Sequence, residues 1–203
     1  MLRAGITGSI AVGKSFVSSV FAELGCHLLD ADQTAREVVA HGSAGLRAIV
    51  AEFGSEVLRT DGALDRAKLG AIVFADETKR ARLNALLHPL IISAQDEWMR
   101  ERAAEDPRGI GIVDAALMIE SGSYRRFDKL IVVHCRTELQ LERLVKRDGL
   151  SVAEAERRIA AQMPQEEKKR FADYLIDTSN NFDETRAQVI VVYESLKALA
   201  TES

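Results

Sequence analysis

The sequence has few cysteines, no excess of basic residues and no long apolar run, and each absence argues against a class of protein. Its two cysteines, Cys26 and Cys135, both lie in apolar, strand-like segments. We therefore expect buried thiols in a reducing compartment rather than a disulfide or a metal site. The formal net charge of -4 is unlike that of proteins that bind duplex nucleic acid, which usually carry a basic excess. No apolar run approaches the roughly 18 residues that span a membrane.

Length and composition favour a folded chain of modest size. The 203 residues suffice for one α/β domain with an inserted subdomain, and a hydrophobic content of 47% supports a core. No signal peptide is expected, because a strand-like segment begins almost at the first residue. Together these features predict a cytoplasmic protein, a monomer or weak homo-oligomer, whose partners are small molecules rather than nucleic acid or membranes.

The segment from Gly8 to Ser15, GSIAVGKS, fits the P-loop pattern G-x-x-x-x-G-K-[ST]. Gly8 and Gly13 allow the backbone to turn and to approach a phosphate without a Cβ in the way. The backbone amides that follow can then donate to phosphate oxygens at the start of a helix. Lys14 places a cation at the β- and γ-phosphates, and Ser15 can ligate Mg²⁺. The alternative is a glycine-bearing turn between strand and helix that binds no ligand.

The sequence around the motif has the strand and helix that a P-loop requires. Residues 4–7 are mostly apolar, as expected of a buried strand, and apolar residues then recur at helical spacing until Gly25. Further strands are predicted at 27–29, 109–113, 130–133 and 174–176. Because strands alternate with helices, we predict an α/β fold in which a P-loop parallel sheet is flanked by helices on both faces.

Between the second and third predicted strands, nothing from 43 to 102 resembles a strand of a parallel core, and the pattern predicts about 60 residues of helices with a turn at 60–62. This insertion is either helical padding or a subdomain that binds the acceptor of a reaction. We expect one P-loop kinase domain, with its core at about 1–35, 108–136 and 172–203, a helical acceptor-binding subdomain at about 36–107 and a helical lid at about 137–171.

Local signals refine the helical segments. Asp65 is predicted to cap a helix, and Pro89 to break or kink one after His88. Thr137 and Ser151 are each predicted to begin a capping box, with helices that run to about residues 148 and 163.

Acidic residues follow two predicted strands, at the sheet edge where ligands of such folds gather. Asp32 is the candidate general base that accepts the proton of an attacking hydroxyl, and a helix N-cap is the alternative. Asp114 ends the third strand and can hold Mg²⁺ through water; a cap for the following segment is its alternative. Both carboxylates are also candidates for contact with the substrate.

Arg143 and Arg147 are four residues apart and share one face of a predicted helix. Arginines on a mobile helical flap can stabilise phosphate charge during transfer. The alternative is a solvated surface on which Glu138, Glu142 and Glu154 are their partners. A lone histidine such as His88 is more often a structural hydrogen-bonder than a catalyst, and no second His or Cys lies at metal-ligand spacing from it.

Beyond the P-loop, the chain resembles the dephospho-coenzyme A kinase family nearly from end to end. The resemblance rests on GITGSIAVGKS, on LLDAD ending at Asp32, on DGALDRAKLGAIVFAD at 61–76, on LLHPLI around His88, on IVDAALMIE at 112–120 and on RRIAAQMPQEEK with Gln162. The P-loop occurs in many families, whereas the 61–76 segment and the His-Pro pair are far more selective.

The resemblance implies a phosphotransferase with an alcohol acceptor, which uses ATP and Mg²⁺ to phosphorylate the 3′-hydroxyl of dephospho-coenzyme A in the last step of coenzyme A synthesis. The implied fold is like that of nucleoside monophosphate kinases, with an acceptor-binding helical domain and a lid. The implied site residues are Ala11, Val12, Gly13, Lys14, Ser15 and Phe16 at the ATP phosphates, Asp32 as the acceptor-side acid, Arg143 and Arg147 on the lid, and His88 in the acceptor domain.

Some positions depart from the family's pattern. Phe16 stands where threonine is usual, which we expect to matter little because the backbone amide contacts the phosphate. Ala115-Ala116 replaces the usual Ile-Pro, and residues 177–180 replace a turn rich in Asn and Gly. Two alternatives stay open: another P-loop small-molecule or nucleoside monophosphate kinase, and a nucleotide switch that signals by loop ordering. The sequence has no N-K-x-D segment, which argues against a GTPase switch.

Overall fold

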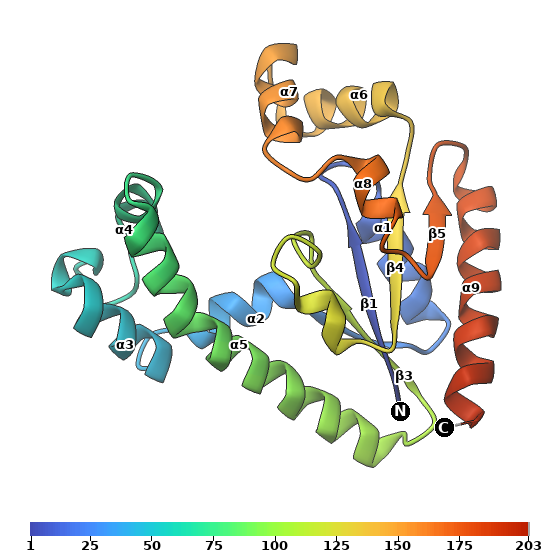
Figure 1. The fold of residues 1–203 in the computed structure, drawn as a ribbon, viewed down its shortest axis with the longest axis horizontal. Coiled ribbons are helices and arrows are strands. Elements are labelled where there is room, and N and C mark those ends of the chain that lie inside the picture. Colours follow the sequence, from blue (N-terminus) through green and yellow to red (C-terminus); the bar gives the residue numbers. More distant parts are fainter. Residues whose placement is uncertain (203) are drawn as a thin grey trace. The chain divides into compact units, whose positions relative to one another are not determined.

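The structure, a computed structural model, describes residues 1–202. It divides the chain into two compact units (Figure 1). Residues 1–29 and the chain from residue 101 onward form the first unit, and residues 30–100 form the second. Each unit has a hydrophobic core of its own.

The first unit is built on a five-stranded sheet in the order β2-β3-β1-β4-β5. The strands are β1 (Leu2–Gly8), β2 (His27–Asp30), β3 (Ile110–Asp114), β4 (Lys129–His134) and β5 (Tyr174–Asp177). β1 pairs in parallel with both β3 and β4, and β4 pairs in parallel with β5. The predicted parallel sheet is therefore confirmed. Its central strands are buried along nearly their whole length, which is why they are continuous apolar runs in the sequence.

Helices flank this sheet (Figure 1). In the first unit they are α1 (Lys14–Glu23), η2 (Ser123–Arg126), α6 (Thr137–Asp148), α7 (Val152–Ala160), α8 (Gln165–Lys169) and α9 (Phe182–Glu202). α1 and α9 pack together against the sheet, and Phe21 and Leu196 are fully buried in this core. α1 begins directly after the P-loop, as predicted, so its amino end faces the loop.

The carboxyl ends of the strands form the edge of the sheet that carries the P-loop. β1 ends at Gly8, which pairs with Val133 of β4, while Ile6 pairs with Asp114 at the end of β3. The chain passes to one side of β1 to form β2 and β3 and then to the other side to form β4 and β5. Such a reversal marks the place where ligands bind in open α/β sheets.

The second unit is helical, as predicted for the insertion. Its elements are α2 (Ala31–Val38), α3 (Ala44–Phe53), η1 (Ser55–Val57), α4 (Arg66–Phe74) and most of α5 (Glu77–Glu105). Ile49 and Val57 are fully buried at the centre of this core. Asp65 caps α4, as predicted, because its carboxylate accepts from the amides of Ala67 and Lys68.

Two of the local predictions were wrong in detail. Of the two outcomes predicted for Pro89, the break is wrong: α5, 29 residues long in all, runs through it. Proline removes the hydrogen bond to the Ala85 carbonyl, but both residues are exposed, so water can take the place of the missing amide. Thr137 is the first residue of α6 rather than its cap, which is Arg136. The capping box at Ser151 is confirmed, although α7 ends at Ala160.

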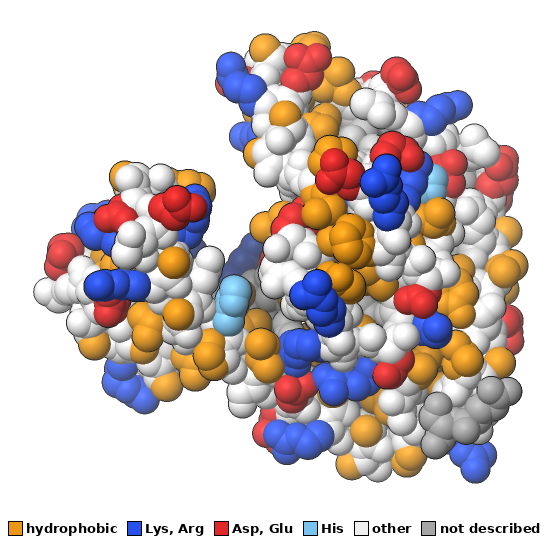
Figure 2. Space-filling model, in the orientation of Figure 1, with side chains coloured by type: hydrophobic (Ala, Val, Ile, Leu, Met, Phe, Trp, Pro, Cys, Tyr) orange, Lys and Arg blue, Asp and Glu red, His pale blue; other side chains and the backbone are white. Residues whose placement is uncertain are grey.

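Both cysteines are free and buried, as expected, and burial raises the pKa of the Cys26 thiol to about 12. Within the part of the chain that the structure describes, every helix is too short or too polar to cross a membrane. On the face that Figure 2 shows, basic side chains are interspersed with acidic ones and do not form one continuous basic surface.

Candidate active site

The P-loop connects β1 to α1, and its backbone explains the residues of the motif. A Cβ added to Gly8 would lie 2.6 Å from the carbonyl oxygen of Val133, so only glycine fits against β4. Gly13 has φ +89°, a left-handed conformation that favours glycine. Ala11 is also left-handed, with φ +61°, which costs an L residue about 1–2 kcal/mol. A strained alanine of this kind persists only where its surroundings hold it.

A cavity of about 670 Å³ opens over this loop. Residues 8–15 line it together with Ala116 and Gln162, and its charged lining residues are Lys14, Arg143, Lys146 and Arg147. All four are basic, and the amino end of α1 adds the positive end of a helix dipole. The arrangement therefore attracts a polyanion the size of a nucleotide phosphate tail.

Lys14 forms an ion pair with Asp114, which joins the P-loop to the end of β3. The hydroxyl of Ser18 donates to the second carboxylate oxygen of Asp114 at 2.7 Å. Both partners of the ion pair are mostly buried, with 21% of Lys14 and 16% of Asp114 exposed. Both carboxylate oxygens of Asp114 therefore contact side chains and not the backbone of the following segment, which Asp114 would cap in the alternative interpretation.

The two arginines of the segment predicted to be a lid have different partners. Arg143 lines the cavity and donates to the Thr178 hydroxyl at 2.9 Å and to the Thr178 carbonyl at 2.8 Å. Arg147 lines it too and donates to Asp148 at 2.7 Å, a bond that raises the pKa of Arg147. Neither is paired with Glu138, Glu142 or Glu154 among the residues that the structure describes. Both arginines therefore line the cavity, and the glutamates of the alternative interpretation are not their partners.

A second cavity, of about 430 Å³, shares Gly13 and Arg143 with the first. Its apolar wall is the ring pair of Phe16 and Phe182, with ring centres 4.7 Å apart. Phe182 is 71% exposed, so a large flat apolar surface stays open beside the loop. Stacking is a common way for proteins to hold a nucleobase.

Two residues at this site carry no local signal in the sequence, and sequence reasoning missed them. The Thr178 hydroxyl donates to the P-loop carbonyl of Val12 at 2.6 Å, so the residue that follows β5 holds the loop in place. The ammonium group of Lys168 is buried and donates to the carbonyl of Ala116 at 2.8 Å and to Glu120 at 2.9 Å. Lys168 lies in the charged run QEEKK, where nothing distinguishes a buried lysine from a solvated one.

Asp32 and His88 lie in the second unit. Asp30, not Asp32, is the N-cap of α2, because the Asp30 carboxylate accepts from the amides of Asp32 and Gln33 at 2.8 and 3.0 Å. The capping alternative for Asp32 is therefore wrong, and its side chain is exposed in the first turn. His88 is also exposed, on α5 directly before Pro89.

The second unit contains a basic cavity of its own, of about 440 Å³. Arg36, Arg59, Arg66 and His41 line it, with Asp65 as the acidic member of the set. Within residues 1–202, no three His, Cys, Asp or Glu side chains gather into a metal-binding group. A cation at either cavity would therefore need ligands from a bound substrate as well as from the protein.

The chain is similar to proteins of one family. A family model described as Dephospho-CoA kinase matches residues 2–184. A curated Dephospho-CoA kinase of Geobacter metallireducens is 43% identical over 194 residues, covering 96% of each chain. One of Geobacillus kaustophilus is 42% identical, covering 98% of each chain. The solved structure of Dephospho-CoA kinase from Campylobacter jejuni has a TM-score of 0.73 at 30% identity and covers 97% of each chain.

Proposed function

The chain belongs to the dephospho-CoA kinase family, and we propose that the basic cavity over its P-loop binds ATP for that family's reaction. In this reaction the γ-phosphoryl group of ATP passes to the 3′-hydroxyl of dephospho-coenzyme A, giving coenzyme A and ADP. The observation that carries the proposal is that the charged groups around the P-loop cavity are all basic and lie at the carboxyl edge of the sheet. A phosphate tail supplies the complementary charge.

The backbone amides of residues 11–16 hold the phosphate oxygens, and Lys14 neutralises charge on the β- and γ-phosphates. The left-handed turns at Ala11 and Gly13 support this role, because they turn successive amides toward one side of the loop. The transferred group needs little covalent help from a protein. Alignment and charge stabilisation therefore account for most of the catalysis that we assign to this loop.

Mg²⁺ fits the donors at this site. Ser15 is exposed in the cavity and offers a hydroxyl, and Asp114 offers a carboxylate at the adjoining strand end. Oxygen donors of this kind, few in number and completed by phosphate and water, suit a small hard cation. We propose that Ser15 holds the ion directly and Asp114 through water. Bound there, the ion would neutralise charge on the β- and γ-phosphates.

The segment 137–171 is proposed to act as the lid, with Arg143 as a catalytic residue and Arg147 as a phosphate ligand. Both already line the cavity, and their guanidinium groups suit phosphate oxygens. The cavity between Phe16 and Phe182 is proposed to hold the adenine ring, because it adjoins the phosphate cavity at Gly13.

On the acceptor side, we propose that Asp32 accepts the proton of the 3′-hydroxyl as the new O–P bond forms and ADP departs. Its exposed carboxylate makes no hydrogen bond or ion pair with other described side chains, so it is available to a substrate. His88 and Asp114 are proposed to contact the acceptor. The basic cavity lined by Arg36 and Arg66 has the charge to hold the diphosphate of dephospho-coenzyme A.

A coupled assay for ADP release tests the proposal. With Mg·ATP and the purified chain, dephospho-coenzyme A should support turnover, whereas AMP, CMP and shikimate should not. Turnover with AMP or CMP alone would favour a nucleoside monophosphate kinase. Tight ATP binding that no acceptor converts into turnover would favour a nucleotide switch.

Replacing Arg143 by alanine is expected to lower kcat/KM by about 10- to 100-fold, the range for losing a hydrogen bond to a charged group. The loss in thermal stability should be small, because Thr178 keeps its bond to Val12. Arg158→Ala is the matched control: Arg158 also lies in the lid segment and donates to Asp148 at 3.1 Å, but it does not line the cavity. Equal kinetic and thermal damage in the Arg143 variant would assign Arg143 to structure alone.

We also propose a cytoplasmic location and a functional form that is a monomer or a weak homo-oligomer. The two free, buried cysteines are in keeping with a reducing compartment. Sedimentation of the purified chain over a range of concentrations will distinguish the two assembly states.

A further inference from the structure

Two glutamines of the segment 137–171 contact the P-loop at a single residue, Ile10. The Nε2 of Gln140 donates to the Ile10 carbonyl at 2.8 Å. The Ile10 amide donates to the Oε1 of Gln162, also at 2.8 Å. Both backbone polar groups of one loop residue are therefore held by side chains that lie 130 and 152 residues further along the chain.

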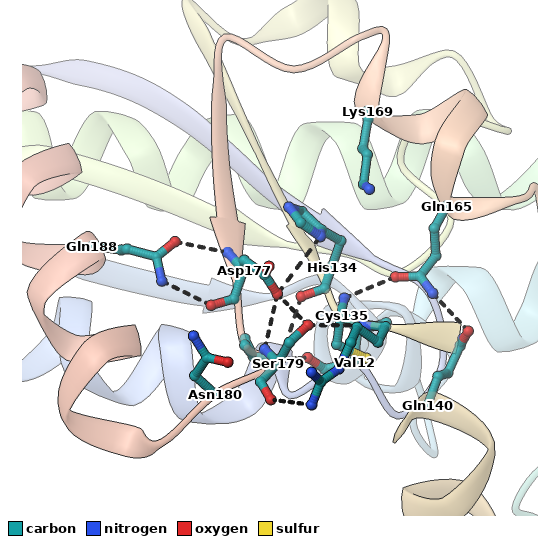
Figure 3. A network of polar contacts seen from close by, with 12 residues as sticks. Val12, His134, Cys135, Gln140, Gln165, Lys169, Asp177, Ser179, Asn180 and Gln188 are labelled. Atoms are coloured by element: carbon teal, nitrogen blue, oxygen red, sulfur yellow. Dashed lines mark hydrogen bonds and ion pairs between the residues drawn. The ribbon is translucent and has the colours of Figure 1, made fainter. Parts of the chain in front are cut away.

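A third glutamine determines the orientation of the first. The amide of Cys135, just after β4, donates to the Oε1 of Gln165 at 3.0 Å, and the Nε2 of Gln165 donates to the Oε1 of Gln140 at 2.8 Å (Figure 3). A backbone amide can only donate, so it fixes which end of the Gln165 carboxamide faces it. The Gln165 Nε2 then faces Gln140, whose own Nε2 is left to face Ile10. The backbone amide of Cys135, just after β4, thus sets which group donates and which accepts in the hydrogen bonds that lead through Gln165 and Gln140 to Ile10.

The bond from Gln140 fixes the peptide group between Ile10 and Ala11, and Ala11 is the strained residue of the loop. In a trans peptide the C=O and the N–H point in opposite directions. The bond from Gln140 to the Ile10 carbonyl therefore turns the Ala11 N–H away from Gln140, which is itself only 1% exposed. Ala11 lines the phosphate cavity and has φ +61°, a conformation that needs outside support.

We propose that Gln140, with Gln165 behind it, is a positioning residue that aims the Ala11 N–H at a phosphate of ATP, and that Gln162 supports it by fixing the preceding Ser9–Ile10 peptide. The inference rests on the proposed phosphate role of the P-loop. It adds a direct link from the lid segment to the loop: helices that carry arginines over the phosphates also set the loop beneath them.

The near-isosteric variants Gln140→Met and Gln162→Met remove these bonds with little change in volume. We expect each to raise the KM for ATP and the Kd for Mg·ATP by about tenfold, as for the loss of one well-aligned hydrogen bond. The KM for dephospho-coenzyme A should stay within about twofold of the wild-type value, because the acceptor contacts are not touched. Gln162 is less buried than Gln140, so its variant tests the proposal even if Gln140→Met does not fold.

The chain offers a matched control in Gln188. Its side chain also holds both backbone groups of one residue, Asp177: it accepts from the amide at 2.9 Å and donates to the carbonyl at 2.8 Å (Figure 3). Asp177 lines neither cavity at the P-loop. Gln188→Met and Gln162→Met should therefore lower the melting temperature to a similar extent, yet Gln188→Met should leave the KM for ATP within about twofold.

A double variant tests whether Gln165 acts through Gln140. If Gln165 acts only through Gln140, Gln140→Met/Gln165→Met should bind Mg·ATP no more weakly than Gln140→Met alone. The inference is overturned if Gln140→Met and Gln162→Met bind Mg·ATP as the wild type does, or if Gln188→Met weakens binding equally. It is also overturned if the double variant binds Mg·ATP more weakly than Gln140→Met alone. Absence of Mg·ATP binding by the wild-type chain would instead refute the proposed function.

Discussion

Lys14→Ala is expected to lower kcat by about 10²–10³-fold, the range measured when one preorganised donor at a developing charge is removed. Lys14 is the P-loop cation, and its ion pair with Asp114 holds the ammonium group at the cavity wall. Charge on the β- and γ-phosphates grows as the terminal phosphoryl group is transferred, so the loss should fall mainly on kcat. Steady-state kinetics with saturating dephospho-coenzyme A will measure it.

Ser18→Ala separates this effect from damage to the Lys14–Asp114 contact. Ser18 donates to the other oxygen of Asp114 at 2.7 Å and does not line the phosphate cavity. Its loss should cost about 1.5–3 kcal/mol of stability, as for a hydrogen bond to a charged group, with little change in kcat. If Lys14→Ala keeps near wild-type turnover, or if Ser18→Ala loses as much turnover as Lys14→Ala, the P-loop lysine does not have the role that we assign to it.

The parts of this site that could be predicted are those whose chemistry is local in sequence. The P-loop needs two glycines, a lysine and a serine at fixed spacing, because consecutive backbone groups must turn around one phosphate. The spacing of the apolar residues is sufficient to predict the strand before the loop and the helix after it. The clash that a Cβ on Gly8 would make with Val133 is the structural counterpart of the first glycine.

The parts that could not be predicted are contacts between residues far apart in the chain. Lys14 and Asp114 are separated by 100 residues, and Arg143 and Thr178 by 35. Arg143 had plausible acidic partners nearby in the sequence, and only the packing of the sheet edge shows that Thr178 is its partner instead. Lys168 is the extreme case. Nothing in its local sequence distinguishes it from a surface lysine, and it is buried because the Ala116 carbonyl and Glu120 lie around its ammonium group.

Helix N-caps show that prediction from the sequence is also limited between neighbouring residues. Both Asp30 and Asp32 are residues that favour an N-cap, and the choice depends on which residue ends β2. β2 runs one residue further than predicted, to Asp30, so α2 begins at Ala31 and Asp32 falls inside its first turn. This single shift removes the structural explanation for Asp32 and leaves its carboxylate free for chemistry.

Asp32→Asn is therefore expected to lower kcat by about 10²–10⁴-fold, the usual contribution of a general base. Asparagine keeps the shape of the side chain but no longer accepts the proton of the 3′-hydroxyl. The Kd for Mg·ATP should stay close to the wild-type value, since we assign the nucleotide to the P-loop. Because Asp32 caps no helix, the melting temperature should also change little.

Asp30→Asn is the charge-matched control, two residues away. It removes the same negative charge from the same short segment, and asparagine remains a good N-cap for the amides of Asp32 and Gln33. A loss of turnover confined to Asp32→Asn identifies that carboxylate as the proton acceptor. Equal losses in both variants would mean that the negative charge of the segment, and not a base at Asp32, sustains the reaction. Unchanged turnover in Asp32→Asn would leave proton removal to solvent or to the phosphate itself.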